Sequence, residues 1–327
     1  MIGGKCFITK VDKGSDAEKK RLQFGDEIYA INGVAPVREN LWKLRYFFFY
    51  LRPQPSLKFI TIKPDQRIFE TIVVPKIIEG LEHNDFVSDG AGIMRYRYIR
   101  DQEYKHEKEM RQFYSDRDGV FIWKMSTFTI AAETVDSMMA KAAKAKGIVF
   151  DLRGNGGGYI DTLQRLIANI FDHNVKIGDE KRRKETKEQI AKTRGKDVYS
   201  GPVVVLIDSQ SGSASELFAR VVQLEKRGTV IGDTSAGAVM EAERFSYNTG
   251  LDVVVPFGAS ITIADLIMKD GKSLEKVGVT PDILVLPTGN DIVGKRDVTL
   301  AKALETLRVK ITAEAAGAMF PVEDDNK

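Results

Sequence analysis

Residues 203–224 read VVVLIDSQSGSASELFARVVQL, and this stretch decides the fold class. It begins with a continuous apolar run, which is typical of a strand buried on both faces of a sheet. Its second half repeats apolar residues at helical spacing. A buried strand that leads through a serine-rich loop into a helix indicates a parallel α/β sheet, and such a loop is a common position for a nucleophile.

The same alternation continues on the N-terminal side of this stretch. Buried strands are predicted over residues 119–125, 146–152 and 201–208, and helices over residues 131–145 and 159–171. Strands that alternate with helices form parallel sheets with crossover connections. The sequence therefore predicts an α/β core.

Residues 1–76 form a different, mostly β unit. Residues 24–33, FGDEIYAING, predict a turn, a strand and a tight Asn-Gly turn. Residues 39–51 predict an amphipathic helix that ends before two prolines. The stretches 56–63 and 68–74 alternate in polarity and predict a hairpin.

The composition excludes several classes of protein. The 327 residues are sufficient for two domains, and 43% hydrophobic with 29% charged residues is typical of a globular protein. No apolar run reaches the roughly 18 residues that cross a bilayer, so no transmembrane segment is expected. A net charge of +3 gives no indication of a nucleic-acid partner. The single cysteine, Cys6, excludes an internal disulfide and is interpreted as a small apolar strand residue. We expect no cofactor and no metal.

A glycine-rich turn follows the predicted strand over residues 146–152. Residues 150–158, FDLRGNGGG, lead into a helix, so several backbone N–H groups lie at a helix N-terminus, where they can bind an anion. A dinucleotide fingerprint requires a glycine where Tyr159 stands, and the Gly-Lys-Ser/Thr of a phosphate loop is missing. With nucleotide phosphates disfavoured, the other anion that such a site binds is the oxyanion of an acyl-transfer intermediate.

Local chemistry leaves the roles of the serines open. A serine at the start of the second helix lies in positive potential that favours an alkoxide, and the N–H of Ala214 would be an oxyanion donor. The alternative is that Ser213 or Ser215 is the N-cap of that helix, and from local chemistry alone capping is the simpler interpretation.

Four ordered motifs resemble the carboxyl-terminal processing (tail-specific) serine protease family, which also contains the tricorn-protease core. The motifs are GIVFDLRGNGGG, GPVVVLIDSQSGSASELFA, VIGDTSAGA and VGVTPDI. The resemblance spans roughly residues 119–287 and implies a crotonase-like (ClpP/crotonase) α/β parallel-sheet protease core, which we place at residues 119–290.

The resemblance also implies roles for individual residues. The family nucleophile is the first serine of Ser-Ala-Ser-Glu, which is Ser213, and Ser215 and Glu216 are then helix N-terminal residues that fix the loop. The oxyanion donors that the resemblance implies are the backbone amides of Gly156, Gly157 and Ala214.

The resemblance leaves the general base open. In the tail-specific branch a lysine about 25 residues downstream accepts the proton, and Ala238 stands at that position. In the tricorn-like branch a histidine is supported by a glutamate, whose position matches Glu275, although a surface glutamate is the alternative interpretation. That histidine comes from a segment before the PDZ-like unit, so we expect it from sequence upstream of Met1 or from a second copy. The histidines of this chain are His83, His106 and His173, and all are interpreted as surface residues. If one of them is recruited as the base, His83 is the choice, because the linker that carries it could fold over the site.

Residues 8–34, ITKVDKGSDAEKKRLQFGDEIYAINGV, resemble a PDZ domain of bacterial proteases. Such domains capture an extended peptide by strand addition and hold its terminal carboxylate with backbone amides. The resemblance places peptide binding at Gly3, Gly4, Phe7 and Ile8, with part of the domain expected upstream, and a rigid cap is the alternative. The predicted divisions besides the core are a PDZ-like domain over 1–76, a linker or cap over 77–118, and a C-terminal helix and tail over 291–327.

Three functions follow from these patterns. The favoured one is a serine endopeptidase that cuts proteins near their C-termini, with protein or peptide tails as substrates. Because the base is missing, efficient turnover is not expected of the isolated chain, and a homo-oligomer is an open option. The alternatives are a catalytically silent peptide-binding relative and a scaffold. Members of the resembled family usually work in the periplasm or are secreted, whereas the residues after Met1 carry no basic and apolar signal regions.

Overall fold

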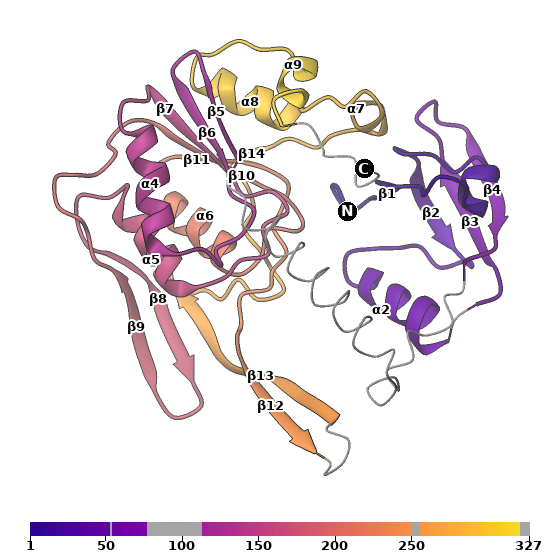
Figure 1. Cartoon of the computed structure of the whole chain (residues 1–327), viewed down its shortest axis with the longest axis horizontal. Helices are drawn as coiled ribbons and strands as arrows, with labels where there is room; N and C mark the ends of the chain where they lie inside the picture. The colour runs from indigo at the N-terminus through magenta and orange to yellow at the C-terminus, as the bar shows by residue number, and fades with distance from the viewer. Residues whose placement is uncertain (53, 77–112, 250–254, 321–327) are drawn as a thin grey trace, which may run out of the picture. The chain divides into compact units, whose positions relative to one another are not determined.

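The chain divides into two compact units in the computed structural model (Figure 1). The described residues are 1–52, 54–76, 113–249 and 255–320. The smaller unit comprises residues 1–81, 285–305 and 310–327, and the larger unit residues 82–284 and 306–309.

The larger unit is built on a six-stranded sheet with the order β14-β11-β10-β7-β6-β5. All neighbouring strands are parallel except β5 and β6, so the predicted parallel α/β sheet is confirmed. The two central strands, β7 and β10, are buried along their whole length. The strands are β5 Phe113–Arg117, β6 Val120–Lys124, β7 Gly147–Asp151, β10 Val203–Ile207, β11 Thr229–Gly232 and β14 Ile283–Leu284.

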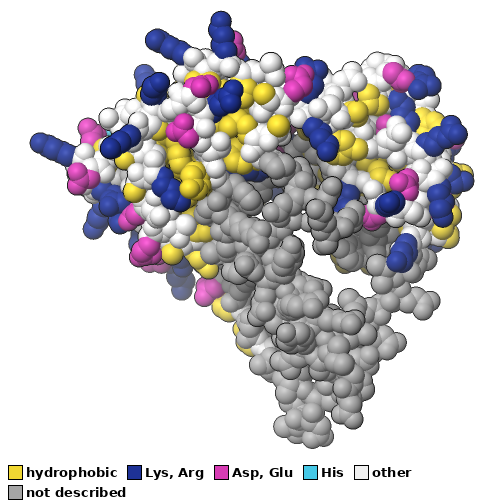
Figure 2. Space-filling view, turned by 45° about the horizontal axis from the view of Figure 1, so that its top comes forward, with side chains coloured by type: hydrophobic (Ala, Val, Ile, Leu, Met, Phe, Trp, Pro, Cys, Tyr) yellow, Lys and Arg dark blue, Asp and Glu magenta, His cyan; other side chains and the backbone are white. Residues whose placement is uncertain are grey.

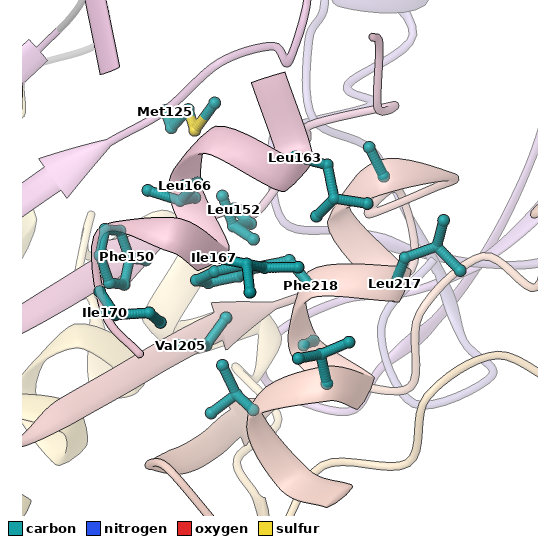
Figure 3. Packing of buried hydrophobic residues seen from close by; sticks show 14 of the residues in the cluster. Met125, Phe150, Leu152, Leu163, Leu166, Ile167, Ile170, Val205, Leu217 and Phe218 are labelled. Carbon is teal, nitrogen blue, oxygen red and sulfur yellow. The ribbon is translucent and has the colours of Figure 1, made fainter. Parts of the chain in front are cut away.

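Three helices lie beside this sheet: α4 (Ala132–Ala142), α5 (Ile160–Ala168) and α6 (Ala214–Leu224). Their apolar faces and the central strands form one hydrophobic core (Figure 3). The ring of Phe150 on β7 meets the ring of Phe218 on α6 edge to face, with centroids 5.3 Å apart. The helix that carries the serine loop is therefore fixed to the centre of the sheet by aromatic packing.

A second, antiparallel sheet belongs to the larger unit and has the order β12-β13-β8-β9. Its strands are β8 Val175–Arg182, β9 Thr186–Ala191, β12 Glu241–Thr249 and β13 Val255–Met268. The strand β12 begins directly after Met240 and is therefore joined in sequence to the loop that contacts the serine turn.

Strand β5 lies inside the range 77–118 that the sequence assigns to a linker or cap. A turn at Asp118 and Gly119, with φ of 53° and 84°, joins it to β6 as an antiparallel hairpin. An Asp-Gly pair is a strong hairpin signal, because both positions of a type I′ turn need positive φ. The sheet therefore begins before Gly119, and residues 77–112 lie outside the described part of the chain.

The smaller unit contains a four-stranded antiparallel sheet with the order β1-β2-β3-β4. The predicted hairpin over residues 56–63 and 68–74 is confirmed as β3 and β4. The strands are β1 Cys6–Phe7, β2 Glu27–Ile31, β3 Leu57–Ile62 and β4 Ile68–Val73. The helices are α1 Asp16–Lys19, α2 Leu41–Tyr46 and the π-helix η1 Phe47–Leu51.

Three further helices follow the larger unit's last strand: α7 Gly289–Val293, α8 Val298–Thr306 and α9 Ala313–Gly317. Asp297 accepts the N–H of Leu300 at 2.8 Å, the bond of an N-cap residue before an apolar helix. On the face shown in Figure 2, basic and acidic side chains are interspersed over the described surface. Among the described residues, no helix combines the length and apolarity that a membrane span requires.

Asp136 on α4 ties together α5 and the segment after β9. Its carboxylate accepts hydrogen bonds from Arg165, Asn169 and Arg194. Burial opposes ionisation of Asp136, but the hydrogen bonds and the positive charges of the arginines outweigh it, so its pKa lies below the ordinary value. This ion cluster therefore stabilises the folded unit when the carboxyl is charged.

Replacing Asp136 with Asn should lower the free energy of unfolding by about 1–3 kcal/mol at pH 7, because charged hydrogen bonds are lost. A depressed folded pKa contributes stability above the unfolded value of about 3.9, and this contribution disappears as the pH falls through the folded pKa. Urea unfolding of wild type and variant at pH 7 and pH 3 should therefore show a difference that narrows at pH 3. Asp197→Asn, at an exposed position, is the control. An equal difference at both pH values would contradict the prediction.

Candidate active site

Ser213 lies at the turn between β10 and α6, and its side chain is partly exposed. Its backbone has φ of 51° and ψ of −121°, a region that residues with a side chain rarely adopt. The Ser213 N–H donates to the carbonyl of Ala238 at 2.9 Å and to Glu216 Oε2 at 3.0 Å. The surrounding structure thus holds this turn in a strained conformation.

The carboxylate of Glu216 is fully buried and joins two loops. Besides Ser213, it accepts the N–H of Ala238 at 2.9 Å, the hydroxyl of Ser235 at 2.6 Å and the N–H of Gly237 at 2.7 Å. The prediction that Glu216 fixes the serine loop is therefore confirmed. A buried carboxylate is tolerated here because four donors replace its hydration.

Two other serines of the loop serve as structural braces. The hydroxyl of Ser211 donates to the carbonyl of Leu152 at 2.8 Å, and that of Ser215 to the carbonyl of Asn155 at 2.9 Å. Both serines are fully buried, and both bonds cross from the β10 loop to the β7 loop. The predicted role of Ser215 in fixing the loop is confirmed, and neither hydroxyl is placed to attack a substrate.

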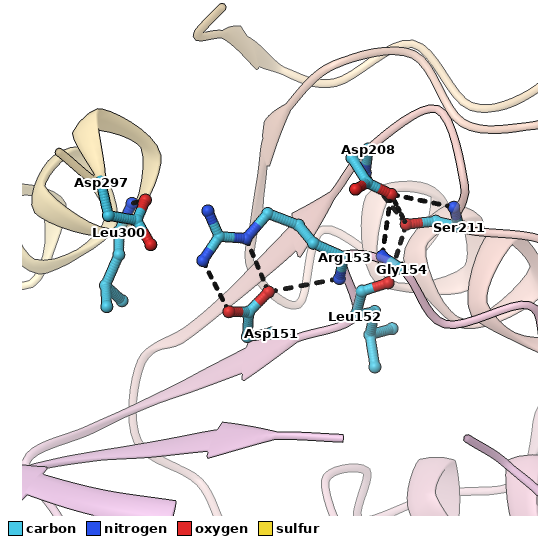
Figure 4. Close-up of polar contacts among 8 residues, drawn as sticks. All are labelled: Asp151, Leu152, Arg153, Gly154, Asp208, Ser211, Asp297 and Leu300. Atoms are coloured by element: carbon cyan, nitrogen blue, oxygen red, sulfur yellow. Dashed lines mark hydrogen bonds and ion pairs between the residues drawn. The ribbon is translucent and has the colours of Figure 1, made fainter. Parts of the chain in front are cut away.

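Charged side chains reinforce the same two loops (Figure 4). Asp208 Oδ1 accepts the N–H of Gly154 at 2.9 Å and that of Ser211 at 3.1 Å. The buried Asp151 binds the guanidinium of Arg153 through both oxygens, at 2.8 and 2.6 Å. The loops after β7 and β10 are therefore tied to each other and to their own strands.

The glycine turn after β7 lies directly against the serine. A Cβ placed on Gly157 would be 2.5 Å from the Cβ of Ser213 and 3.0 Å from the N of Ala214. Gly157 also has φ of +102°. Only glycine permits this approach at this backbone angle, so the two motifs that the sequence singles out meet in space.

The amides of this turn differ in what they bind. The N–H of Gly157 donates to Asn155 Oδ1 at 2.9 Å, so it does not serve as the predicted oxyanion donor in this arrangement. Within the described part of the chain, the N–H groups of Gly156 and Ala214 donate to no acceptor. Ala214 is the first residue of α6, where amides lie in the positive field of the helix.

Glu275 lies beside the same cluster. Its Oε2 accepts the N–H of Val239 at 3.0 Å and that of Met240 at 3.3 Å. Val239 follows Ala238, whose carbonyl binds Ser213. No donor among the described residues binds Glu275 Oε1, so one carboxylate oxygen is available to another group.

No basic side chain of the described residues bonds to Ser213 Oγ. Ala238 contributes only its backbone to the Ser213 turn. His173 lies beyond the C-terminal end of α5, where its ring nitrogen is 2.8 Å from Asp172 Oδ1. The glycine turn adjoins the N-terminal end of the same helix, which is about 13 Å long, so His173 is remote from the turn. His83 and His106 lie outside the described residues.

The residues predicted to bind a peptide lie at the start of the smaller unit. Gly3 and Gly4, with φ of 53° and 82°, form a tight turn closed by two hydrogen bonds between Ile2 and Lys5. The N–H and C=O of Ile8 both bond within the unit, to Asp26 and Gly25. The backbone of Ile8 is therefore not free to pair with an added strand.

A cavity of about 300 Å³ adjoins this turn and is lined by Gly3, Phe7 and the segment from Leu286 to Asn290. Of the four predicted peptide-binding residues, Gly3 and Phe7 border it, and Gly4 and Ile8 do not. Among the described residues, no group of three or more His, Cys, Asp and Glu side chains is arranged to hold a metal ion.

A serine turn and a glycine turn on neighbouring strands of a parallel sheet are the arrangement expected of a serine-peptidase domain. The chain belongs to peptidase family S41, whose model matches residues 120–285. The mixed α/β protease fold with a parallel sheet is that of this family.

Several known proteins are similar to this chain. A carboxy-terminal-processing protease of Bartonella bacilliformis is 28% identical over 164 residues, covering 49% of this chain and 36% of the relative. The carboxy-terminal processing protease CtpB of Bacillus subtilis is 24% identical over 294 residues, covering 87% and 53%. The crystal structure of mature CPAF has a TM-score of 0.61 at 16% identity, covering 88% of this chain and 76% of that chain. The chain thus spans about a third to a half of the two curated relatives.

Replacing Gly157 with Ala should displace the Ser213 turn, because the new Cβ would lie 2.5 Å from the Cβ of Ser213. If Ser213 is the nucleophile, its labelling by a fluorophosphonate should fall at least about tenfold, since a shift of even 1 Å in a reacting group is costly. Gly154→Ala is the matched control, because Gly154 also has positive φ but open space around its Cα. Equal labelling of the Gly157 variant and the control would show that the close approach is unimportant.

Proposed function

We propose that this protein is a serine endopeptidase that cuts proteins in their C-terminal regions, with Ser213 as the nucleophile. The observation that carries the proposal is the strained, partly exposed Ser213 turn packed against Gly157, with the amides of Gly156 and Ala214 available to an oxyanion. Relatives named carboxy-terminal-processing proteases support the choice of reaction and substrate region.

The proposed reaction is acyl transfer through Ser213. Its Oγ attacks the carbonyl carbon of the scissile peptide bond and gives its proton to a general base. The oxygen becomes negatively charged and accepts hydrogen bonds from the N–H groups of Gly156 and Ala214. The base then returns the proton to the leaving amine as the C–N bond breaks, and water releases the acyl group from Ser213 by the same steps.

We propose a histidine as the general base, supplied from outside the described residues by an upstream segment or a second copy. Glu275 would orient this imidazole through Oε1 and stabilise its protonated form. The Val239 and Met240 amides support this role, because they hold Oε2 and so fix the carboxylate beside the Ser213 cluster. Ala238 at the lysine position disfavours a Ser–Lys pair.

We propose that residues 1–76 act as a PDZ-like unit that holds the substrate tail before a crotonase-like core cleaves it. The antiparallel sheet, the buried Asp26 of the Gly-Asp turn and the nearby cavity support a ligand-binding module. Because Ile8 is paired within the unit, we expect peptide contacts on the cavity side, at Gly3 and Phe7.

Replacing Ser213 with Ala should abolish fluorophosphonate labelling and reduce cleavage of a peptide substrate at least about 10³-fold. Ser209→Ala, in the same loop, should retain both. The labelled residue is identified by mass spectrometry of the digested protein. If wild type is not labelled but a C-terminal peptide binds with saturation, the chain is a silent peptide-binding relative.

Replacing Glu275 with Gln separates its electrostatic role from its structural one. The amide oxygen can still accept the N–H groups of Val239 and Met240, so the unfolding free energy should change by less than about 1 kcal/mol. If the carboxylate supports an imidazolium, kcat should fall about 10²–10⁴-fold. Unchanged kcat, measured with the protein that includes the segment or second copy supplying the base, would assign Glu275 to loop structure alone.

A further inference from the structure

We propose that Asn155 is the positioning residue that decides which amides of the glycine turn face the oxyanion. This inference rests on the proposed function, because it concerns the same site. Asn155 lies in the middle of the glycine motif and its side chain is fully buried. The sequence gives no reason to assign this role to Asn155 over its neighbours, but the contacts of its side chain do.

Four hydrogen bonds of Asn155 join three segments of the larger unit. Its Nδ2 donates to the carbonyl of Met125 at 2.8 Å, just after β6. Its Oδ1 accepts the N–H of Gly157 at 2.9 Å. Its backbone carbonyl accepts the N–H of Gly212 and the hydroxyl of Ser215, both at 2.9 Å, in the serine loop.

The chemistry of these partners requires an amide side chain. Met125 presents a carbonyl, which needs a donor, and Gly157 presents an N–H, which needs an acceptor. An asparagine offers both in one plane, and the partners also fix which end is oxygen. An aspartate would place a negative oxygen against the Met125 carbonyl, and an alanine would leave two buried groups unsatisfied.

The bond from Gly157 to Asn155 determines which amides of the turn remain available to an oxyanion. Because Gly157 N–H is held by Asn155, the donors that remain without a described acceptor are Gly156 and Ala214. The same residue fixes the distance between the two donors, since its backbone carbonyl binds the serine loop that contains Ala214. Loss of the side chain should therefore release the glycine turn while Ser213 keeps its own bonds to Ala238 and Glu216.

A displaced oxyanion donor weakens transition-state binding more than substrate binding. For Asn155→Asp and Asn155→Ala we therefore expect kcat to fall about 10²–10³-fold, the effect of losing one donor, with KM within about threefold of wild type. A residue that only stabilised the fold would lower the active fraction without this split between kcat and KM.

Tyr199→Phe is the matched control. The hydroxyl of Tyr199 also donates to a backbone carbonyl, that of Ala145 at 3.2 Å, and its side chain is largely buried. Both residues precede the strands β10 and β7, so they lie at the edge of the parallel sheet opposite the serine turn. This variant should lose stability, measured by urea unfolding, with kcat and KM unchanged.

The test combines peptidase kinetics of the protein that includes the source of the base with amide hydrogen exchange at Gly157, followed by NMR. In wild type the Gly157 amide should be protected, and in Asn155→Ala it should exchange at least about tenfold faster at conditions where both are folded. Unchanged kcat in both Asn155 variants, or a Gly157 amide that already exchanges freely in wild type, would overturn the inference.

The two proposals fail in different ways. If wild type cleaves nothing and Ser213 is not labelled, the proposed function fails, and the exchange measurement still decides the role of Asn155. Faster exchange confined to the glycine turn in Asn155→Ala would then support the inference. Identical exchange in wild type and variant would reject it, whatever the activity.

Discussion

The buried carboxylate of Glu216 is the interaction on which the site depends. A carboxylate transferred from water into a protein interior is destabilised unless other groups replace its hydration. Here four donors do so, and they come from the serine turn and from residues 235–238. The requirement to satisfy this charge fixes both loops at once, and it holds Ser213 in a backbone conformation that the chain would not adopt alone.

The parallel sheet explains why the two loops meet. The strands β7 and β10 are neighbours and run in the same direction, so their carboxyl ends lie at one edge. The glycine turn follows one strand and the serine turn follows the other. Gly157 then permits contact between them, and the Ser211 and Ser215 hydroxyls tie the loops together. The order of the strands in the sheet therefore determines which residues meet at the site.

The parts that the sequence predicts correctly are those with a periodic or local signal. Continuous apolar runs identify β7 and β10, and helical spacing identifies α5 and α6. The Asp118-Gly119 turn carried a hairpin signal for β5 that the assignment to a linker overlooked. The strands β8 and β9 are rich in charged residues, which obscures their alternation, and the occupation of the Gly157 amide by Asn155 depends on a side-chain contact that no periodicity reveals.

Glu216 and Glu275 have different roles around Ser213. Glu216 has all its bonds inside the protein and serves geometry, whereas Glu275 has one oxygen bound and one facing no described donor. Among the described residues, the Ser213 turn and the amides of Gly156 and Ala214 are thus held in place without a contact to a basic side chain. A preorganised oxyanion site contributes to catalysis by its geometry before any proton moves. Under the proposed function, a base supplied by another segment or another copy would therefore require no rearrangement of the loops that hold Ser213.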